Sequence, residues 1–209
     1  PLGTKNEIEE QPKRDLKGLL KNKEFYKYLL FYTLVAGTVR VGDSFLNLYM
    51  TQELHLDIMA WGFVYSGFVF VEVLVLRYLS LKGSLMDERK LFSLGTFLFV
   101  LRFLAYCIPL PVPVLIALTM LRGISWGIYL YTHIRYITKI VKMGNITAAI
   151  LIITLMYSIF TAVGNLISGW LIEAYGYPLF FISQTTLVFL GFLSFLVLTP
   201  KIKQSPANE

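Results

Sequence analysis

Long apolar segments recur along almost the whole 209-residue chain. A helix needs about 20 consecutive apolar residues to cross roughly 30 Å of hydrocarbon, and these segments reach or approach that length. The composition agrees, because 56% of the residues are hydrophobic and only 15% are charged, which is not typical of soluble domains. We therefore predict an all-α membrane protein with six transmembrane helices. Their expected ranges are 25–50, 58–80, 91–109, 112–137, 146–172 and 177–199.

The connections between these ranges contain the turn-forming and polar residues that the apolar segments lack. None of them is long enough to form a second domain. Residues 1–24 are rich in Lys, Glu, Asn and Pro and are predicted to be a solvated cytoplasmic linker, and residues 200–209 are predicted to be a short cytoplasmic tail. The expected organisation is one transmembrane bundle over 25–199 with a polar segment at each end.

Basic residues alternate between the connections. The linker, the second and fourth connections and the tail contain Lys or Arg, whereas 51–57, 109–113 and 173–178 contain neither. Since Lys and Arg in short loops are retained in the cytoplasm, we expect a multi-pass protein of the cell membrane with both termini cytoplasmic. This topology, with attraction to anionic lipids, also explains the net charge of +6, so no nucleic-acid partner is expected.

Five ionisable residues lie well inside the predicted helices, and each costs at least about 2.5–3.5 kcal/mol at the bilayer centre. They are Arg40, Asp43, Glu72, Arg102 and Arg122. Arg40 and Asp43 are three residues apart, so they could form a purely structural pair on one helix. The other three have no opposite charge one turn away and need partners or water across helices. The set predicts an interior polar cavity.

Little in the sequence indicates catalysis. Cys107 is the only cysteine, which excludes an intrachain disulfide and a multi-cysteine metal site. His55 lies in a predicted outer connection and His133 near the inner end of a helix, and neither accompanies a nucleophile. We expect no catalytic residue, no bound metal and no cofactor.

One helix carries two further features. Gly123 and Gly127 are four residues apart, so they lie on one helix face and predict close approach by a neighbouring helix. Trp126 lies one turn from Arg122, and we expect it to offer a stacking surface in the cavity.

Two motifs then resemble a known family. The segment NLISGWLIEAYGYPLFF at 165–181 is similar to the junction between the eleventh and twelfth helices of major facilitator superfamily transporters. DERK at 87–90, preceded by Gly83, resembles a shortened form of the cytoplasmic G-x-x-x-D-R/K-x-G-R/K loop of that superfamily. With the topology, these motifs resemble the C-terminal six-helix half of such a transporter, over about residues 18–199.

Within the superfamily, the pattern resembles the oligosaccharide/proton symporters typified by lactose permease, and the related nucleoside symporters. Asp43 matches the second of two aspartates on the seventh helix, with Arg40 at the place of the first. Arg102 resembles the essential arginine of the ninth helix, and Glu72 the substrate-contacting glutamate of the eighth. On the tenth helix, Arg122 stands at the family's histidine and Ser125 at its proton-carrying glutamate. The resemblance thus implies substrate binding by Arg102, Glu72 and Arg122, to which the spacing adds Trp126. It also implies a proton-coupling or buried charge network of Arg40, Asp43, Glu72 and Ser125.

The expected function is proton-coupled symport of a sugar, oligosaccharide or nucleoside-like solute by alternating access. Ser125 cannot replace the proton-carrying carboxylate, so Glu72 or Asp43 could carry the coupled proton instead. Alternatively, the three arginines outnumber the two acids, and the cavity could suit an anionic substrate. The alternative is a non-transporting membrane protein, either a partner-binding subunit or an intramembrane enzyme. The superfamily needs two bundles, and this chain begins without Met. We therefore interpret it as a fragment or a truncated gene product that lacks an N-terminal six-helix half.

Overall fold

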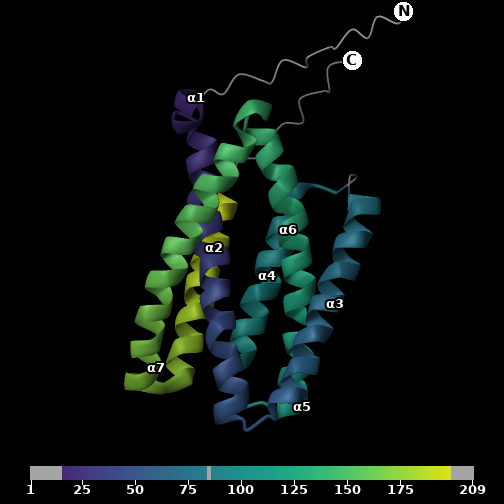
Figure 1. The fold of residues 1–209 in the computed structure, drawn as a ribbon, viewed down its shortest axis with the longest axis vertical. Coiled ribbons are helices and arrows are strands. Elements are labelled where there is room, and N and C mark those ends of the chain that lie inside the picture. Colours follow the sequence, from purple (N-terminus) through teal and green to yellow (C-terminus); the bar gives the residue numbers. More distant parts are fainter. Residues whose placement is uncertain (1–15, 84–85, 199–209) are drawn as a thin grey trace, which may run out of the picture.

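The structure is a computed structural model that describes residues 16–83 and 86–198, and every element in these ranges is helical (Figure 1). The prediction of an all-α membrane protein is confirmed at this level. The elements are α1 (Leu16–Leu20), α2 (Lys23–Leu48) with a π-helical turn (Tyr49–Glu53), α3 (Ile58–Lys82), α4 (Glu88–Tyr106), α5 (Val112–Thr119), α6 (Leu121–Ile140), a 3₁₀ turn (Met143–Asn145) and α7 (Ile146–Leu198).

The expected count of six membrane-crossing helices is not confirmed. Four helical stretches of the described residues are long and apolar enough to cross a membrane, and they are Lys23–Glu53, Ile58–Lys82, Val112–Ile140 and Met143–Val197. The segment expected at 91–109 corresponds to α4, which begins with three charged residues, Glu88, Arg89 and Lys90, and contains Arg102. Because α4 is only 19 residues long, any stretch of it long enough to cross a membrane contains at least three of these charges.

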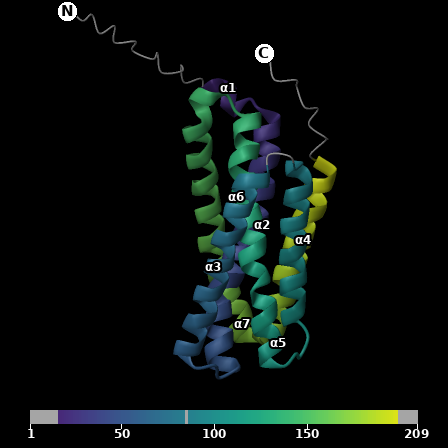
Figure 2. The same cartoon turned by 90° about the vertical axis from the view of Figure 1, so that its right-hand side faces the viewer.

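The segments expected at 146–172 and 177–199 both lie in α7. At Gly176 the backbone leaves the helical region, with φ 80° and ψ 176°, and Pro178 follows two residues later. Glycine adopts this positive φ without a steric cost, which allows the chain to turn there. Figures 1 and 2 show α7 reversing direction at this turn. A straight helix of 53 residues would be about 80 Å long, which is more than twice the hydrocarbon thickness.

Polar side chains fix the helix starts. Asn22 Oδ1 accepts hydrogen bonds from the backbone N–H groups of Glu24 and Phe25, at 3.0 and 3.2 Å. Asp57 caps α3 and Asp87 caps α4 in the same way. The predicted linker over 1–24 therefore contains α1 and the first residues of α2. Its residues 1–15, and the tail at 200–209, lie outside the described residues.

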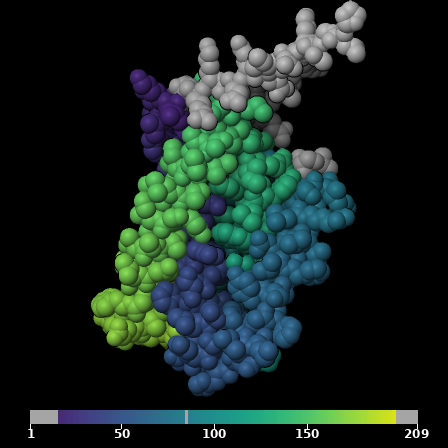
Figure 3. Space-filling model, viewed as in Figure 1, coloured from purple at the N-terminus to yellow at the C-terminus, as the bar shows by residue number. Residues whose placement is uncertain are grey.

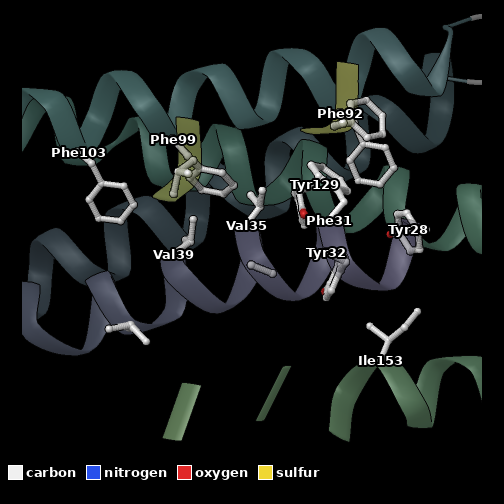
Figure 4. Close-up of a cluster of buried hydrophobic side chains, with 14 of the residues drawn as sticks. Tyr28, Phe31, Tyr32, Val35, Val39, Phe92, Phe99, Phe103, Tyr129 and Ile153 are labelled. Atoms are coloured by element: carbon white, nitrogen blue, oxygen red, sulfur yellow. The ribbon is translucent and has the colours of Figure 1, made fainter. Parts of the chain in front are cut away.

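Aromatic side chains dominate the core between α2, α4 and α6. Figure 4 shows Tyr28, Phe31 and Tyr32 of α2 together with Phe92 of α4 and Tyr129 of α6, and four of these five are almost completely buried. The helices pack in pairs around this core, α2 along α7, α3 along α6, and α4 against both α6 and α7. In Figure 3 the lower half of α2 reaches the surface between α7 and α3.

The glycine pair of α6 lies directly against α3. A β-carbon at Gly123 would overlap the carbonyl oxygen of Phe68, and one at Gly127 would lie 3.0 Å from the carbonyl oxygen of Glu72. The predicted close approach of a neighbouring helix is confirmed. It brings Glu72 next to the start of α6, where Arg122 is located.

The connections fall into two groups in space. Figures 1 and 2 place α1, the C-terminal end of α3, the start of α4 and the turn between α6 and α7 at one end of the bundle. The connection between α2 and α3, α5 and the turn of α7 lie at the other end. The basic connections are therefore at one end, and the connections without Lys or Arg are at the opposite end.

Candidate functional site

A polar stripe runs along one face of α2. Arg40, Asp43, Ser44 and Asn47 follow the spacing i, i+3, i+4 and i+7, so they lie above one another on the helix surface. Arg40 lies 17 residues after the start of α2 at Lys23, or about 25 Å along the axis. The stripe thus begins near the middle of the membrane-crossing stretch Lys23–Glu53 and runs toward its C-terminal end.

An aromatic stripe on α3 ends in an acid. Trp61, Tyr65, Phe68 and Glu72 also fall on one helix face. Trp61 and Phe68 are buried, with 6% and 1% of their surface exposed, whereas Tyr65 is exposed. The stripe therefore offers a partly accessible wall of rings leading to a carboxylate.

A cavity of about 220 Å³ lies between the two stripes. It is lined by Arg40, Asp43, Ser44, Leu46, Asn47, Trp61, Tyr65, Phe68 and Arg122. Pockets for drug-sized ligands occupy about 300–1,000 Å³, so this cavity holds a small molecule or one part of a larger one. One wall is polar and cationic and the opposite wall is aromatic.

Asp43 is the centre of a charge network that joins four helices. Its Oδ1 accepts a hydrogen bond from Nη2 of Arg102 on α4, and its Oδ2 accepts one from Nε of Arg122 on α6, at 2.8 Å. Nη1 of Arg122 in turn lies 3.5 Å from Oε2 of Glu72 on α3. The expectation that Glu72, Arg102 and Arg122 need partners across helices is met by these ion pairs.

The guanidinium groups of the network are buried, so they need the neighbouring carboxylates as counter-charges. Arg102 has none of its surface exposed and Arg122 only 6%. Both guanidinium groups also lie over rings, Arg102 at 4.7 Å from the centre of Phe103 and Arg122 at 4.4 Å from that of Phe68. A buried cation without a counter-charge is strongly destabilising, so Asp43 is required by both arginines.

The intrahelical pair suggested by the spacing of Arg40 and Asp43 is not formed. Both oxygens of Asp43 are taken by Arg102 and Arg122, and Arg40 makes no ion pair with any described residue. The reason is that a carboxylate gains most beside cations removed from water, and Arg40 is exposed. Arg40 lines the cavity instead.

Four residues expected at the site, Arg102, Trp126, Ser125 and Glu72, lie outside the lining of the cavity. Arg102 is behind Asp43, on the side of α4. Trp126 stacks on Tyr129, with ring centres 6.0 Å apart and planes 11° apart. The hydroxyl of Ser125 is buried and donates to the carbonyl oxygen of Leu121 at 2.6 Å. Of the expected residues, Arg40, Asp43 and Arg122 do line it, and Glu72 reaches it through Arg122.

The sequence reasoning did not identify the aromatic wall. Trp61, Tyr65 and Phe68 were treated as ordinary residues of an apolar segment. The signal that would have found them is the helical spacing of three rings that continues to Glu72 on the same face.

A second charge cluster, also missed, joins helices at the end with the basic connections. Glu88 lies 2.6 Å from Nη2 of Arg135 and 2.8 Å from Nζ of Lys139, while Nη2 of Arg89 donates to the carbonyl oxygen of Leu196 at 2.7 Å. Burial raises the pKa of Glu88, but its contacts with Lys139 and Arg135 outweigh this and hold the pKa below its usual value. The DERK motif thus connects α4 to α6 and α7.

Within residues 16–83 and 86–198, no group of three or more His, Cys, Asp or Glu side chains is placed to hold a metal ion. The acids of the network instead contact arginines.

The long apolar helices are those of an integral membrane protein, and buried charges lie beside its cavity. The sequence matches the model of the Major Facilitator Superfamily over residues 5–209, and the chain belongs to this family. The fold is also similar to the crystal structure of a peptide transporter, POT, a mutant in complex with alafosfalin, with a TM-score of 0.75 and 18% identity. That match covers 91% of this chain and 40% of the other, so this chain spans less than half of its length. No curated protein matches the sequence.

Proposed function

We propose that the chain is the C-terminal half of a secondary active transporter that moves a small solute together with protons by alternating access. The observation that carries the proposal is the network of Arg102, Asp43, Arg122 and Glu72, which joins four helices beside the cavity. Ionisable residues inside membrane helices are costly and are typical of substrate and proton pathways. Membership of the family supports the same interpretation.

The other half is proposed to face the polar stripe of α2. Family transporters hold their substrate between two six-helix bundles, near the middle of the membrane. Here the side chains of Arg40 and Asn47 are exposed within the membrane-crossing stretch, where lipid would offer them no polar partners. A facing bundle would enclose them. The basic connections lie together at one end of the bundle, which supports the proposal that both termini are cytoplasmic in a plasma-membrane protein. Six segments are proposed to cross the membrane in this half.

Glu72 is proposed as the residue that carries the coupled proton. Protonation of Asp43 would remove the counter-charge from two buried arginines. Protonation of Glu72 loses a single contact of 3.5 Å, and Arg122 keeps Asp43. Protonation of Glu72 therefore costs less free energy than protonation of Asp43. Its side chain is 16% exposed, which leaves a route for the proton.

The solute is proposed to be sugar-like or nucleoside-like, because the walls suit a flat, hydroxylated molecule. Trp61 and Tyr65 offer stacking surfaces, and Ser44 and Asn47 offer hydrogen bonds. Arg122 is the proposed substrate-binding arginine of the lining. Arg102 is assigned the role of holding Asp43 in position, since it contacts that carboxylate from the side away from the cavity.

Glu72→Gln in a protein carrying both bundles tests this proposal. Proteoliposomes loaded with solute should still exchange it for labelled solute, because exchange needs no net proton movement. Accumulation driven by an imposed pH gradient should be lost. Glu53→Gln, in the exposed connection after α2, is the matched control and should keep both activities. Gradient-driven accumulation by Glu72→Gln would refute the proton role, and failure of any solute to exchange would favour a non-transporting protein.

A further inference from the structure

We propose that the cavity between α2 and α3 selects solutes that carry a planar ring and a negatively charged group, with the charge at Arg40 and the ring against Trp61 and Tyr65. This inference rests on the proposed function and names the substrate class of the same site. It adds a charge requirement, so that among sugar-like and nucleoside-like solutes the site favours those that carry an acidic group.

The charge balance of the site leaves one cation over. The network contains Arg102 and Arg122 as cations and Asp43 and Glu72 as anions, and each cation contacts at least one anion. These four charges compensate one another. Arg40, on the same face of α2 as Asp43, adds a positive charge to the cavity wall.

Asp43 cannot neutralise Arg40 without breaking the network. Oδ1 of Asp43 accepts from Arg102 and Oδ2 accepts from Arg122, so turning the carboxylate toward Arg40 would uncover a guanidinium with 0% or 6% exposure. Arg40 is exposed and makes no ion pair with any described residue. Its planar guanidinium is therefore available to bind a carboxylate or phosphate through two parallel hydrogen bonds.

The opposite wall selects the rest of the solute. Trp61, Tyr65 and Phe68 lie on one face of α3, and Phe68 is already covered by the guanidinium of Arg122 at 4.4 Å. A solute ring would therefore stack mainly on Tyr65, which is 46% exposed although Arg122 lies 5.9 Å from its ring centre, and would contact the small exposed part of Trp61. The cavity volume of about 220 Å³ has room for one small ring system with a short acidic arm.

A matched pair of probes separates the charge from the ring. Indole-3-acetate and indole-3-acetamide share the ring and differ in the negative charge. We expect the purified 209-residue chain to bind the acid at least about tenfold more tightly than the amide in isothermal titration at constant ionic strength, because hydrogen bonds from Arg40 to a carboxylate are stronger than those to a neutral amide.

Three variants test whether the charge of Arg40 causes the difference between the dissociation constants of the acid and the amide. Arg40→Gln should bring the ratio of dissociation constants close to one. Arg77→Gln removes an equivalent positive charge from an exposed position of α3 outside the cavity lining, and should leave the ratio unchanged. Trp61→Leu should weaken both probes by a similar factor and keep the ratio. Thermal unfolding of each variant without probe confirms that it is folded.

The inference is overturned if the acid and the amide bind equally, if neither binds, or if Arg40→Gln retains the preference for the acid. A transporter that exchanges only neutral solutes would contradict the inference while leaving the proposed function intact. Selective binding of the acid by a protein that transports no solute would support the charged site and refute the proposed function.

Discussion

Asp43→Asn removes the acid that both buried arginines contact. Asn keeps one oxygen as a hydrogen-bond acceptor, and Arg122 keeps Glu72, so the main loss falls on Arg102. Arg102 is completely buried, and its Nε and Nη1 have no hydrogen-bond acceptor among the described residues. Removing one partner of a buried ion pair costs about 3–5 kcal/mol, and because Asn retains an acceptor we expect a loss of about 3 kcal/mol for this variant.

The loss should appear as a lower unfolding temperature. At about 2–4 °C for each kcal/mol in a chain of this size, the midpoint should fall by about 6–12 °C. The assay is thermal unfolding of the purified protein in a mild detergent, followed by size-exclusion chromatography of the fraction that remains monodisperse. A control variant, Ser66→Ala, removes an exposed hydroxyl that bonds only to its own helix and should change the midpoint little.

The partner of Asp43 is identified by a second change. Asp43→Asn combined with Arg102→Met removes the uncompensated cation, so the double variant should regain most of the lost stability. Asp43→Asn combined with Arg40→Gln should regain none, because Arg40 is exposed and does not contact Asp43. Recovery by Arg40→Gln instead of Arg102→Met would refute the network described above.

Three further predictions follow from other parts of the molecule. Gly123→Ala should destabilise the protein by about 1–3 kcal/mol, because the added β-carbon meets the α3 backbone, whereas Gly62→Ala, where a β-carbon meets nothing within 4 Å, should not destabilise it; both are measured by thermal unfolding. The pKa of Glu88 is lower in the folded protein than in the unfolded chain. Its contribution to the free energy of unfolding is therefore fully present above the unfolded pKa of about 4.3 and is lost as the pH falls through the lower folded pKa. The stability difference between wild type and Glu88→Gln should therefore be constant from about pH 6 to 8 and shrink below about pH 4.3. Finally, a cysteine at Tyr175 should react with an impermeant maleimide in intact cells, and one at Lys142 only after permeabilisation, since both positions are exposed at opposite ends of the bundle.

Each of these has a contrary result. Equal effects of the two glycine substitutions would mean that α3 and α6 do not pack closely at Gly123. A stability difference for Glu88→Gln that persists at pH 3 would show that its ion pairs are not the cause. The reverse labelling pattern would invert the topology.

Composition and spacing predicted a large part of the molecule. The apolar segments indicated the helices, and the four-residue spacing of Gly123 and Gly127 indicated the close contact between α6 and α3. The number of membrane-crossing helices was less predictable. The four charged residues of α4 and the continuous apolar sequence across Gly176 obscure where one crossing stops and another begins.

The charged residues of the site were predictable as a set, but their pairing was not. Spacing on one helix favoured Arg40 as the partner of Asp43, whereas the direction in which Asp43 points depends on how α2 is rotated against α4 and α6. That rotation places the carboxylate between Arg102 and Arg122, which are removed from water and gain most from it. Single-helix spacing carries no information on such contacts.

The central claim, that this chain is one half of a transporter, is tested most directly by uptake into proteoliposomes under an imposed pH gradient. A panel of labelled sugars, nucleosides and aromatic acids should include a solute that accumulates when the protein carries both bundles. The 209-residue chain alone should show no saturable uptake of that solute, because its cavity lacks the facing wall. Saturable uptake by the 209-residue chain alone would contradict the account.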